Sequence, residues 1–127
     1  MKIVIGIILL FSVSYLDIKP ACSTVKTGDF KLISRHTGTT LIHRTATKQV
    51  EHNQKLNVKV HYTLKWLDAC QYQMFDAKIH KGEEIIEGRK TDTTTVTITD
   101  IQPTFYTATT TSTIMGLSSE VKVDILK

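Results

Sequence analysis

The sequence lacks the motifs that identify the common enzyme and metal-binding classes. It contains no Gly-x-Ser-x-Gly element, no glycine-rich phosphate loop and no carboxylate pair at a catalytic spacing. None of its five histidines stands in a His-x-His or His-Glu-x-x-His arrangement. We therefore predict a protein that is not an enzyme, with no catalytic residues, no metal site and no cofactor.

Dense positive charge and proline are also missing. The net charge is only +4, and the basic residues are scattered without a Lys/Arg run or interleaved aromatics, so nucleic-acid binding is not predicted. Threonine fills 12 of the 23 positions from 91 to 113, but the chain has only two prolines and this segment has no regular repeat. This composition indicates solvated strand faces rather than a glycosylated stalk or a binding array.

No apolar run is long enough to cross a bilayer, which takes about 20 apolar residues. The longest apolar stretch is residues 3–11, which follow Lys2 and precede the small residues Ser12 and Ser14. This is the pattern of a cleaved export signal. We predict a signal peptide at 1–14 and a single β domain at 15–127, with an uncleaved membrane anchor as the alternative.

The rest of the chain shows the two-residue period of β-strands and no helical period. The clearest case is residues 56–66, where apolar residues occupy the even positions. Other predicted strands cover 29–33, 39–45, 49–53, 70–79, 93–101, 105–114 and 119–126. Alternating strands favour an antiparallel sheet. We predict an all-β meander of about eight strands that forms a closed or half-open up-and-down barrel, with a two-sheet sandwich as the alternative.

The hairpin formed by residues 56–66 and 70–79 carries one of only two cysteines. A three-residue loop, Leu67-Asp68-Ala69, would pair Trp66 with Cys70 and point Cys70 inward. The apolar phase changes between Met74 and Phe75, which predicts a β-bulge there. In an exported chain, Cys70 and Cys22 are expected to form a structural disulfide. The alternative is a lipoprotein: Ala21 precedes Cys22 as in a lipobox, and a lipidated Cys22 would hold the protein at a membrane.

A polar group lies in the segment LIHRTATKQVEH. A four-residue loop at 45–48 places Arg44 opposite Gln49 and Ile42 opposite Glu51, so that all three polar side chains share the inner face. There, Arg44 and Glu51 would need each other, because a lone buried charge is very costly. The candidate binding residues are Arg44, Gln49, Glu51, Tyr62 and Trp66. The alternative is an ion pair at the rim that binds nothing.

Three segments resemble a group of small exported β-proteins of Gram-negative bacteria to which no activity is assigned. The shared pattern is Cys22-x₃-Lys26-Thr27-Gly28-x-Phe30, then Ile42-x-Arg44-x₄-Gln49-x-Glu51, then Lys65-Trp66-x₃-Cys70-x-Tyr72. The resemblance implies an architecture and a bridge but no reaction. We expect a periplasmic or secreted protein that binds an unknown ligand or protein. The alternatives are an envelope-associated structural protein without a pocket and, last, an enzyme.

Overall fold

The structure is a computed structural model that describes residues 21–114, 116 and 118–126. The predicted signal peptide lies outside these residues. Among them, no helix combines the length and the apolar character that a membrane span needs.

The described chain forms a short 3₁₀ helix followed by nine strands. The helix, η1, covers Cys22–Val25, a small departure from the predicted absence of helix. The strands are β1 (Gly28–Ser34), β2 (Gly38–Arg44), β3 (Lys48–Asn53), β4 (Val58–Asp68), β5 (Gln71–Lys81), β6 (Glu84–Glu87), β7 (Thr94–Ile101), β8 (Phe105–Ser112) and β9 (Ser118–Leu126).

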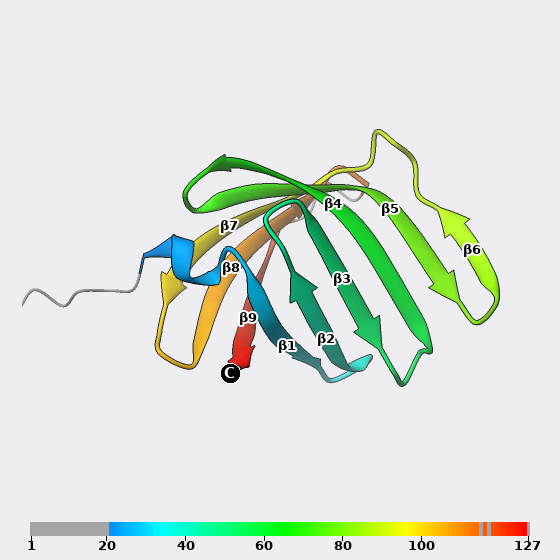
Figure 1. The fold of residues 1–127 in the computed structure, drawn as a ribbon, viewed down its shortest axis with the longest axis horizontal. Helices are drawn as coiled ribbons and strands as arrows, with labels where there is room; N and C mark the ends of the chain where they lie inside the picture. The colour runs from blue at the N-terminus through cyan, green and yellow to red at the C-terminus, as the bar shows by residue number, and fades with distance from the viewer. Residues whose placement is uncertain (1–20, 115, 117, 127) are drawn as a thin grey trace, which may run out of the picture.

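Eight of these strands close into an antiparallel barrel, as Figure 1 shows. The sheet order is β4-β3-β2-β1-β9-β8-β7-β5-β6, and an additional β4–β5 pairing completes the ring. The first and last strands are joined through Phe30 opposite Ile125. The predicted up-and-down barrel is confirmed, and the sandwich alternative is wrong, because continuous pairing leaves one sheet closed on itself.

The ninth strand, β6, was not predicted. It pairs with the end of β5, with Ile79 opposite Ile86, whereas the start of β5 pairs with β7. Its four residues, Glu-Ile-Ile-Glu, are all exposed and do not alternate. Sequence periodicity therefore gives no signal for it. In the turn between β5 and β6, Gly82 takes a positive φ of 59°.

The β4–β5 hairpin keeps the predicted faces but not the predicted register. Leu64 pairs with Met74 and Trp66 with Tyr72, two residues away from the expected partners. The loop is a two-residue turn at Ala69-Cys70, and a bulge at Leu67 absorbs the extra residue. A shift of two residues preserves which side chains share a face, so the inward set was right although the pairing was wrong.

The predicted bulge in β5 is present slightly later in the chain. Tyr62 lies opposite the pair Asp76 and Ala77, because the register shifts between His61 and Thr63. Asp76 has a φ of 52°, a conformation typical of a bulge. Phe75 stays on the outer face opposite Thr63, whereas the apolar phase had placed it on the inner face.

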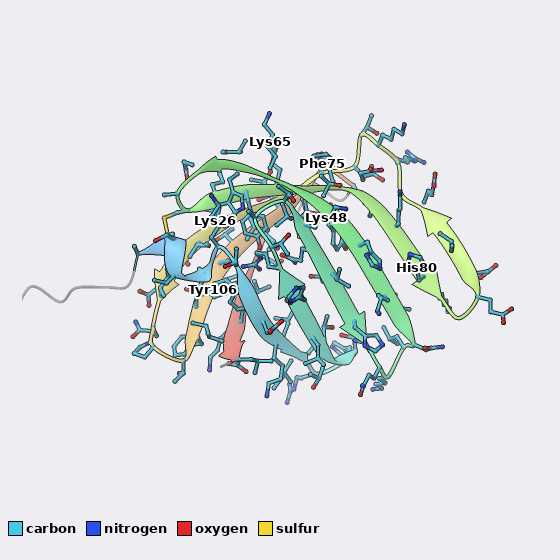
Figure 2. The ribbon with its side chains drawn as sticks, in the orientation of Figure 1. Lys26, Lys48, Lys65, Phe75, His80 and Tyr106 are labelled. Carbon is cyan, nitrogen blue, oxygen red and sulfur yellow. A yellow bond between two sulfur atoms is a disulfide. The ribbon has the colours of Figure 1, made fainter. Side chains whose placement is uncertain are left out.

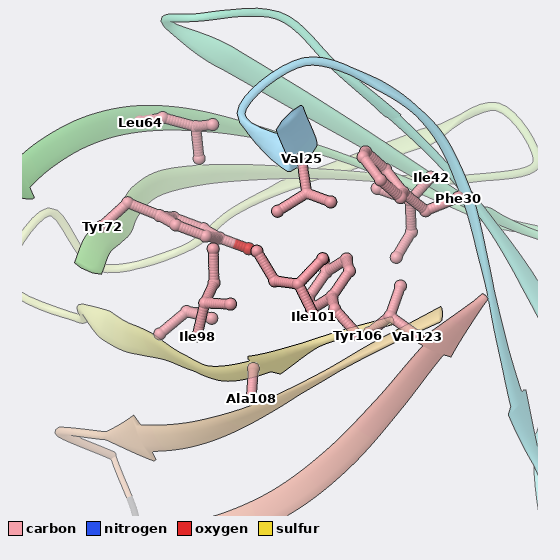
Figure 3. Packing of buried hydrophobic residues seen from close by; sticks show 11 residues of the cluster. Val25, Phe30, Ile42, Leu64, Tyr72, Ile98, Ile101, Tyr106, Ala108 and Val123 are labelled. Atoms are coloured by element: carbon pink, nitrogen blue, oxygen red, sulfur yellow. The ribbon is translucent and has the colours of Figure 1, made fainter. Parts of the chain in front are cut away.

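Buried apolar side chains from η1 and the strands pack together inside the barrel (Figure 3). The buried apolar members of this core are Val25, Phe30, Ile42, Leu64, Tyr72, Val96, Ile98, Ile101, Tyr106, Ala108 and Val123. Alternate positions of β7 and β9 face this core: Val96 and Ile98 are buried, and Val121, Val123 and Ile125 belong to the core or pack against it. Val25 points from η1 into this core, so η1 acts as a plug.

The predicted disulfide between Cys22 and Cys70 is confirmed. The Cα atoms lie 5.2 Å apart, and the bridge joins η1 to the turn between β4 and β5. Cys70 is half-buried in that turn rather than fully inward. The bridge uses the Cys22 sulfur, so it and a lipid attached to Cys22 are mutually exclusive.

Candidate functional site

Two polar side chains are almost completely buried inside the barrel. Arg44 and Gln49 are each 2% exposed, and they lie opposite one another on β2 and β3, as predicted. Ile42 lies opposite Glu51 in the same hairpin, also as predicted. Alternation places Gln49 and Glu51 on the same side of β3.

Arg44 uses three of its five N–H groups in hydrogen bonds within the protein. Its Nε donates to Gln49 Oε1 at 2.7 Å, Nη1 to the Val25 carbonyl at 2.8 Å, and Nη2 to the Tyr106 hydroxyl at 2.8 Å. Its guanidinium carbon lies 4.5 Å from the ring centroid of Phe30 and 5.0 Å from that of Tyr72. Arg44 thus ties the η1 plug to the barrel wall, and these contacts compensate for burying its charge.

Glu51 belongs to the same network but can accept further hydrogen bonds. Gln49 Nε2 donates to Glu51 Oε1 at 3.2 Å and contacts the sulfur of Met74 at 3.3 Å. The Tyr62 hydroxyl also hydrogen-bonds to Glu51. The expected coupling of Arg44 and Glu51 therefore runs through Gln49. A carboxylate can accept about four hydrogen bonds, so Glu51 can accept more than these two.

Burial raises the pKa of the Glu51 carboxyl. The hydrogen bond from Gln49, the charge of Arg44 and the hydrogen bond from Tyr62 partly offset that rise. The pKa of the Tyr62 phenol is raised far above its ordinary value, by burial first and then by the charge of Glu51. Tyr62 therefore remains a hydrogen-bond donor at all ordinary pH values.

A cavity of about 230 Å³ lies inside the barrel beside this network. Its walls are mostly apolar, and Arg44, Gln49 and Glu51 form one side. The lining residues are Leu32, Ile42, Arg44, Gln49, Glu51, Tyr72, Met74, Thr94, Val96, Tyr106, Ala108, Thr110, Val121 and Val123. Arg44 has no acceptor and the Gln49 side-chain oxygen accepts from Arg44, so Glu51 is the main acceptor on this side of the cavity.

The predicted binding residues are only partly brought together. The cavity is lined by Arg44, Gln49 and Glu51. Tyr62 does not line it but hydrogen-bonds to Glu51. Trp66 lies outside the cavity, half-buried, with its ring centroid 4.7 Å from that of Tyr72 and the ammonium of Lys26 at 5.5 Å. Its buried Nε1 has no hydrogen-bond partner within the described part of the chain.

Sequence reasoning missed Tyr106, which closes the far side of the site. It lies 62 positions from Arg44 and meets it only because β8 and β2 face each other across the barrel. Its inward position on an alternating strand was the one available signal. In the described residues, no group of three or more His, Cys, Asp or Glu side chains could hold a metal ion.

No family model, curated protein or solved structure matches this chain. The resemblance to the exported β-proteins therefore stays a prediction. The function proposed below is therefore argued from the geometry of the barrel.

Proposed function

We propose that this protein is an exported, non-catalytic binding protein whose barrel holds a small, largely apolar ligand. The ligand presents one hydrogen-bond-donating group, an amine or a hydroxyl, to Glu51. In this proposal residues 1–14 are the export signal, and the disulfide forms in the oxidising compartment that the chain reaches.

The observation that carries the proposal is a carboxyl group beside an apolar cavity. A volume of about 230 Å³ is below the roughly 300–1,000 Å³ of typical ligand pockets, which favours a small molecule. The Glu51 carboxyl on the cavity wall favours a ligand that donates a hydrogen bond. A buried carboxyl with a raised pKa costs stability when it is ionised, and such costs are common at functional sites.

The test compares three six-carbon probes, hexylamine, hexanol and hexanoate, by calorimetric titration of the folded protein at pH 7. We expect the amine and the alcohol to bind, and hexanoate to bind at least about tenfold more weakly, because its carboxylate meets Glu51. Glu51→Gln should remove this difference in affinity, which we call the affinity gap, since the amide carries no charge. Glu120→Gln removes an equal charge from an exposed position on β9 and should leave the gap unchanged.

Folding of the variant is checked separately. Because the folded-state pKa of Glu51 lies above the unfolded one, its stabilising contribution exists below the unfolded pKa and is lost as pH rises through the folded pKa. Glu51→Gln should therefore be at least as stable as the wild type at pH 7. Equal affinity of the wild type for hexanoate and hexylamine, or no binding of either donor probe, would contradict the proposal.

One observation favours a second candidate, an envelope-associated interaction protein. Strand β6 is bonded along one side, to β5, and exposes Ile85 (63%) and Ile86 (48%) beside acidic residues. An extended basic segment of a partner could add to this edge. The test is binding of a synthetic Lys-Val-Val-Lys peptide, which should be lost in Ile85→Pro and retained in Glu51→Gln. Binding unaffected by Ile85→Pro would exclude this edge.

A further inference from the structure

The structure gathers basic residues that are scattered in the sequence onto one outer face of the barrel. Side chains of β3 and β4 alternate, and because Gln49, Glu51 and Leu64 face inward, their neighbours face outward. The outward set on β3, β4 and β5 includes Lys48, His52, Lys59, His61, Lys78 and His80. Figure 2 labels Lys48 and His80 on this part of the sheet.

These side chains stand opposite one another in two rows across the strands. In one row His61 lies opposite Lys78, and in the next Lys59 lies between His52 and His80. The rings of His61 and His80 meet edge to face, with their centroids 5.0 Å apart. A protonated histidine opposite a lysine places like charges in cross-strand positions, which destabilises a sheet. An anion bound among these side chains would relieve that repulsion.

A pocket of about 230 Å³ lies between these side chains. Lys48, His61, Lys78 and His80 line it together with the hydroxyl-bearing Thr63. Two carboxylates are near: Asp76 at the bulge lines the pocket, and Glu87 on β6 lies opposite Lys78. The pocket thus offers several N–H and O–H donors. Lys48 and Lys78 balance the charges of Asp76 and Glu87, so the pocket gains an excess of positive charge when its histidines are protonated.

We propose that this outer pocket binds a tetrahedral oxyanion of the phosphate or sulfate class, and that binding tightens as the pH falls. The ammonium groups of Lys48 and Lys78 supply charge, and the histidine rings donate N–H groups once they are protonated. This site lies on the opposite side of β3 from the barrel cavity, and Gln49 is the one residue common to the two linings.

Proton linkage sets the direction of the pH dependence. Partial burial lowers the pKa of His61, and so do the charges of His80, Lys59, Lys48 and Lys78. A bound dianion offsets that repulsion and favours the protonated ring, so binding takes up protons. The affinity for the anion then rises by up to about tenfold for each unit by which the pH falls, for each histidine that gains a proton on binding.

The experiment titrates the folded, disulfide-bonded protein with sodium sulfate at constant ionic strength, followed by amide NMR shifts. Sulfate stays doubly charged across this range, so any pH dependence belongs to the protein. Sulfate affinity should rise at least tenfold between pH 8 and pH 6. Lys78→Gln should lower the affinity at least fivefold, and His61→Gln should flatten the pH dependence.

Two further variants test whether the anion binds in this pocket. Asp76→Asn should strengthen binding, because it removes the carboxylate and asparagine also tolerates the positive φ at this bulge. Lys65→Gln removes an equal charge from the other end of β4, where the side chain points away from the barrel (Figure 2), and should change the affinity less than twofold. Equal losses in Lys78→Gln and Lys65→Gln would show diffuse attraction only and overturn the site.

A last comparison separates the two sources of such an anion. Inorganic phosphate is compared with phosphatidylcholine vesicles containing phosphatidic acid. Loss of vesicle binding in Lys78→Gln identifies a lipid headgroup, whereas phosphate binding without vesicle binding identifies a free anion. Absence of binding to sulfate, phosphate and vesicles alike, in protein whose amide spectrum is native, would refute the proposal.

Discussion

At the scale of single residues, Arg44 and Glu51 show two uses of a buried charge. Arg44 places three donors on protein acceptors and packs among three aromatic rings, so its charge holds the structure together. Glu51 keeps free acceptor capacity beside the cavity, and burial raises its pKa. The first arrangement is typical of a structural residue and the second of a binding group.

Removal of the guanidinium of Arg44 should be strongly destabilising. Arg44→Met leaves the Val25 carbonyl and Gln49 Oε1 without their donor and should lower the free energy of unfolding by roughly 3–5 kcal/mol, measured by urea denaturation. Arg44→Lys should recover little, because a single ammonium cannot reach acceptors in three directions. Arg35→Met, at an exposed turn, serves as the control and should change stability by less than about 0.5 kcal/mol. A mild effect of Arg44→Met would mean that the plug does not depend on this network.

At the scale of elements, two bulges shape the β4–β5 hairpin. The bulge at Leu67 permits a tight turn that carries Cys70, and the bulge at Asp76 divides β5 into a part that pairs with β7 and a part that pairs with β6. Extra residues increase local twist and redirect a strand. The same feature that lets the barrel close thus also projects β6 away from it.

The two faces of β4 make a direct test of this hairpin. Trp66 packs against Tyr72 at the edge of the core, so Trp66→Ala should cost roughly 2–4 kcal/mol, somewhat below a fully buried aromatic. Lys65→Ala, on the exposed face, should stay within about 0.5 kcal/mol. Both values come from chemical denaturation followed by circular dichroism. Similar losses in the two variants would mean that the faces are assigned wrongly.

At the scale of the whole molecule, the closed barrel and its plug depend on contacts that are distant in sequence. The β1–β9 pairing joins the two ends of the described chain, and the bridge joins η1 to the turn after β4 across 48 positions. Because η1 also supplies Val25 to the core, the bridge fixes the end of the barrel that lies beside Arg44.

Replacement of both cysteines by alanine should lower stability by roughly 2–5 kcal/mol while the strand content stays the same. The loss has two origins: a longer free chain in the unfolded state and a plug that can now leave Arg44. The measurement is urea denaturation together with far-ultraviolet circular dichroism. A thiol assay that finds two free cysteines in the folded wild-type protein would disprove the bridge itself.

Patterns in the sequence predicted the eight barrel strands, most of the inner faces and the polar set at the Arg44–Glu51 hairpin. Those properties follow from two-residue alternation and from a short loop, which are local. The patterns also predicted the bridge, because a chain predicted to be exported and containing two cysteines leaves one partner for each. They did not determine the register of the β4–β5 hairpin, since a shift of two residues keeps every side chain on its face.

The contacts that these residues make depend on the tertiary structure. Closure of the barrel brought Tyr106 to Arg44 and left Glu51 as the acceptor that faces the cavity. Pairing of β3, β4 and β5 turned scattered lysines and histidines into one basic face. β6 formed although its sequence does not alternate, because β5 offered it a free edge beyond the bulge. In each case the pairing of strands, rather than the period within one strand, brings the side chains or backbones together.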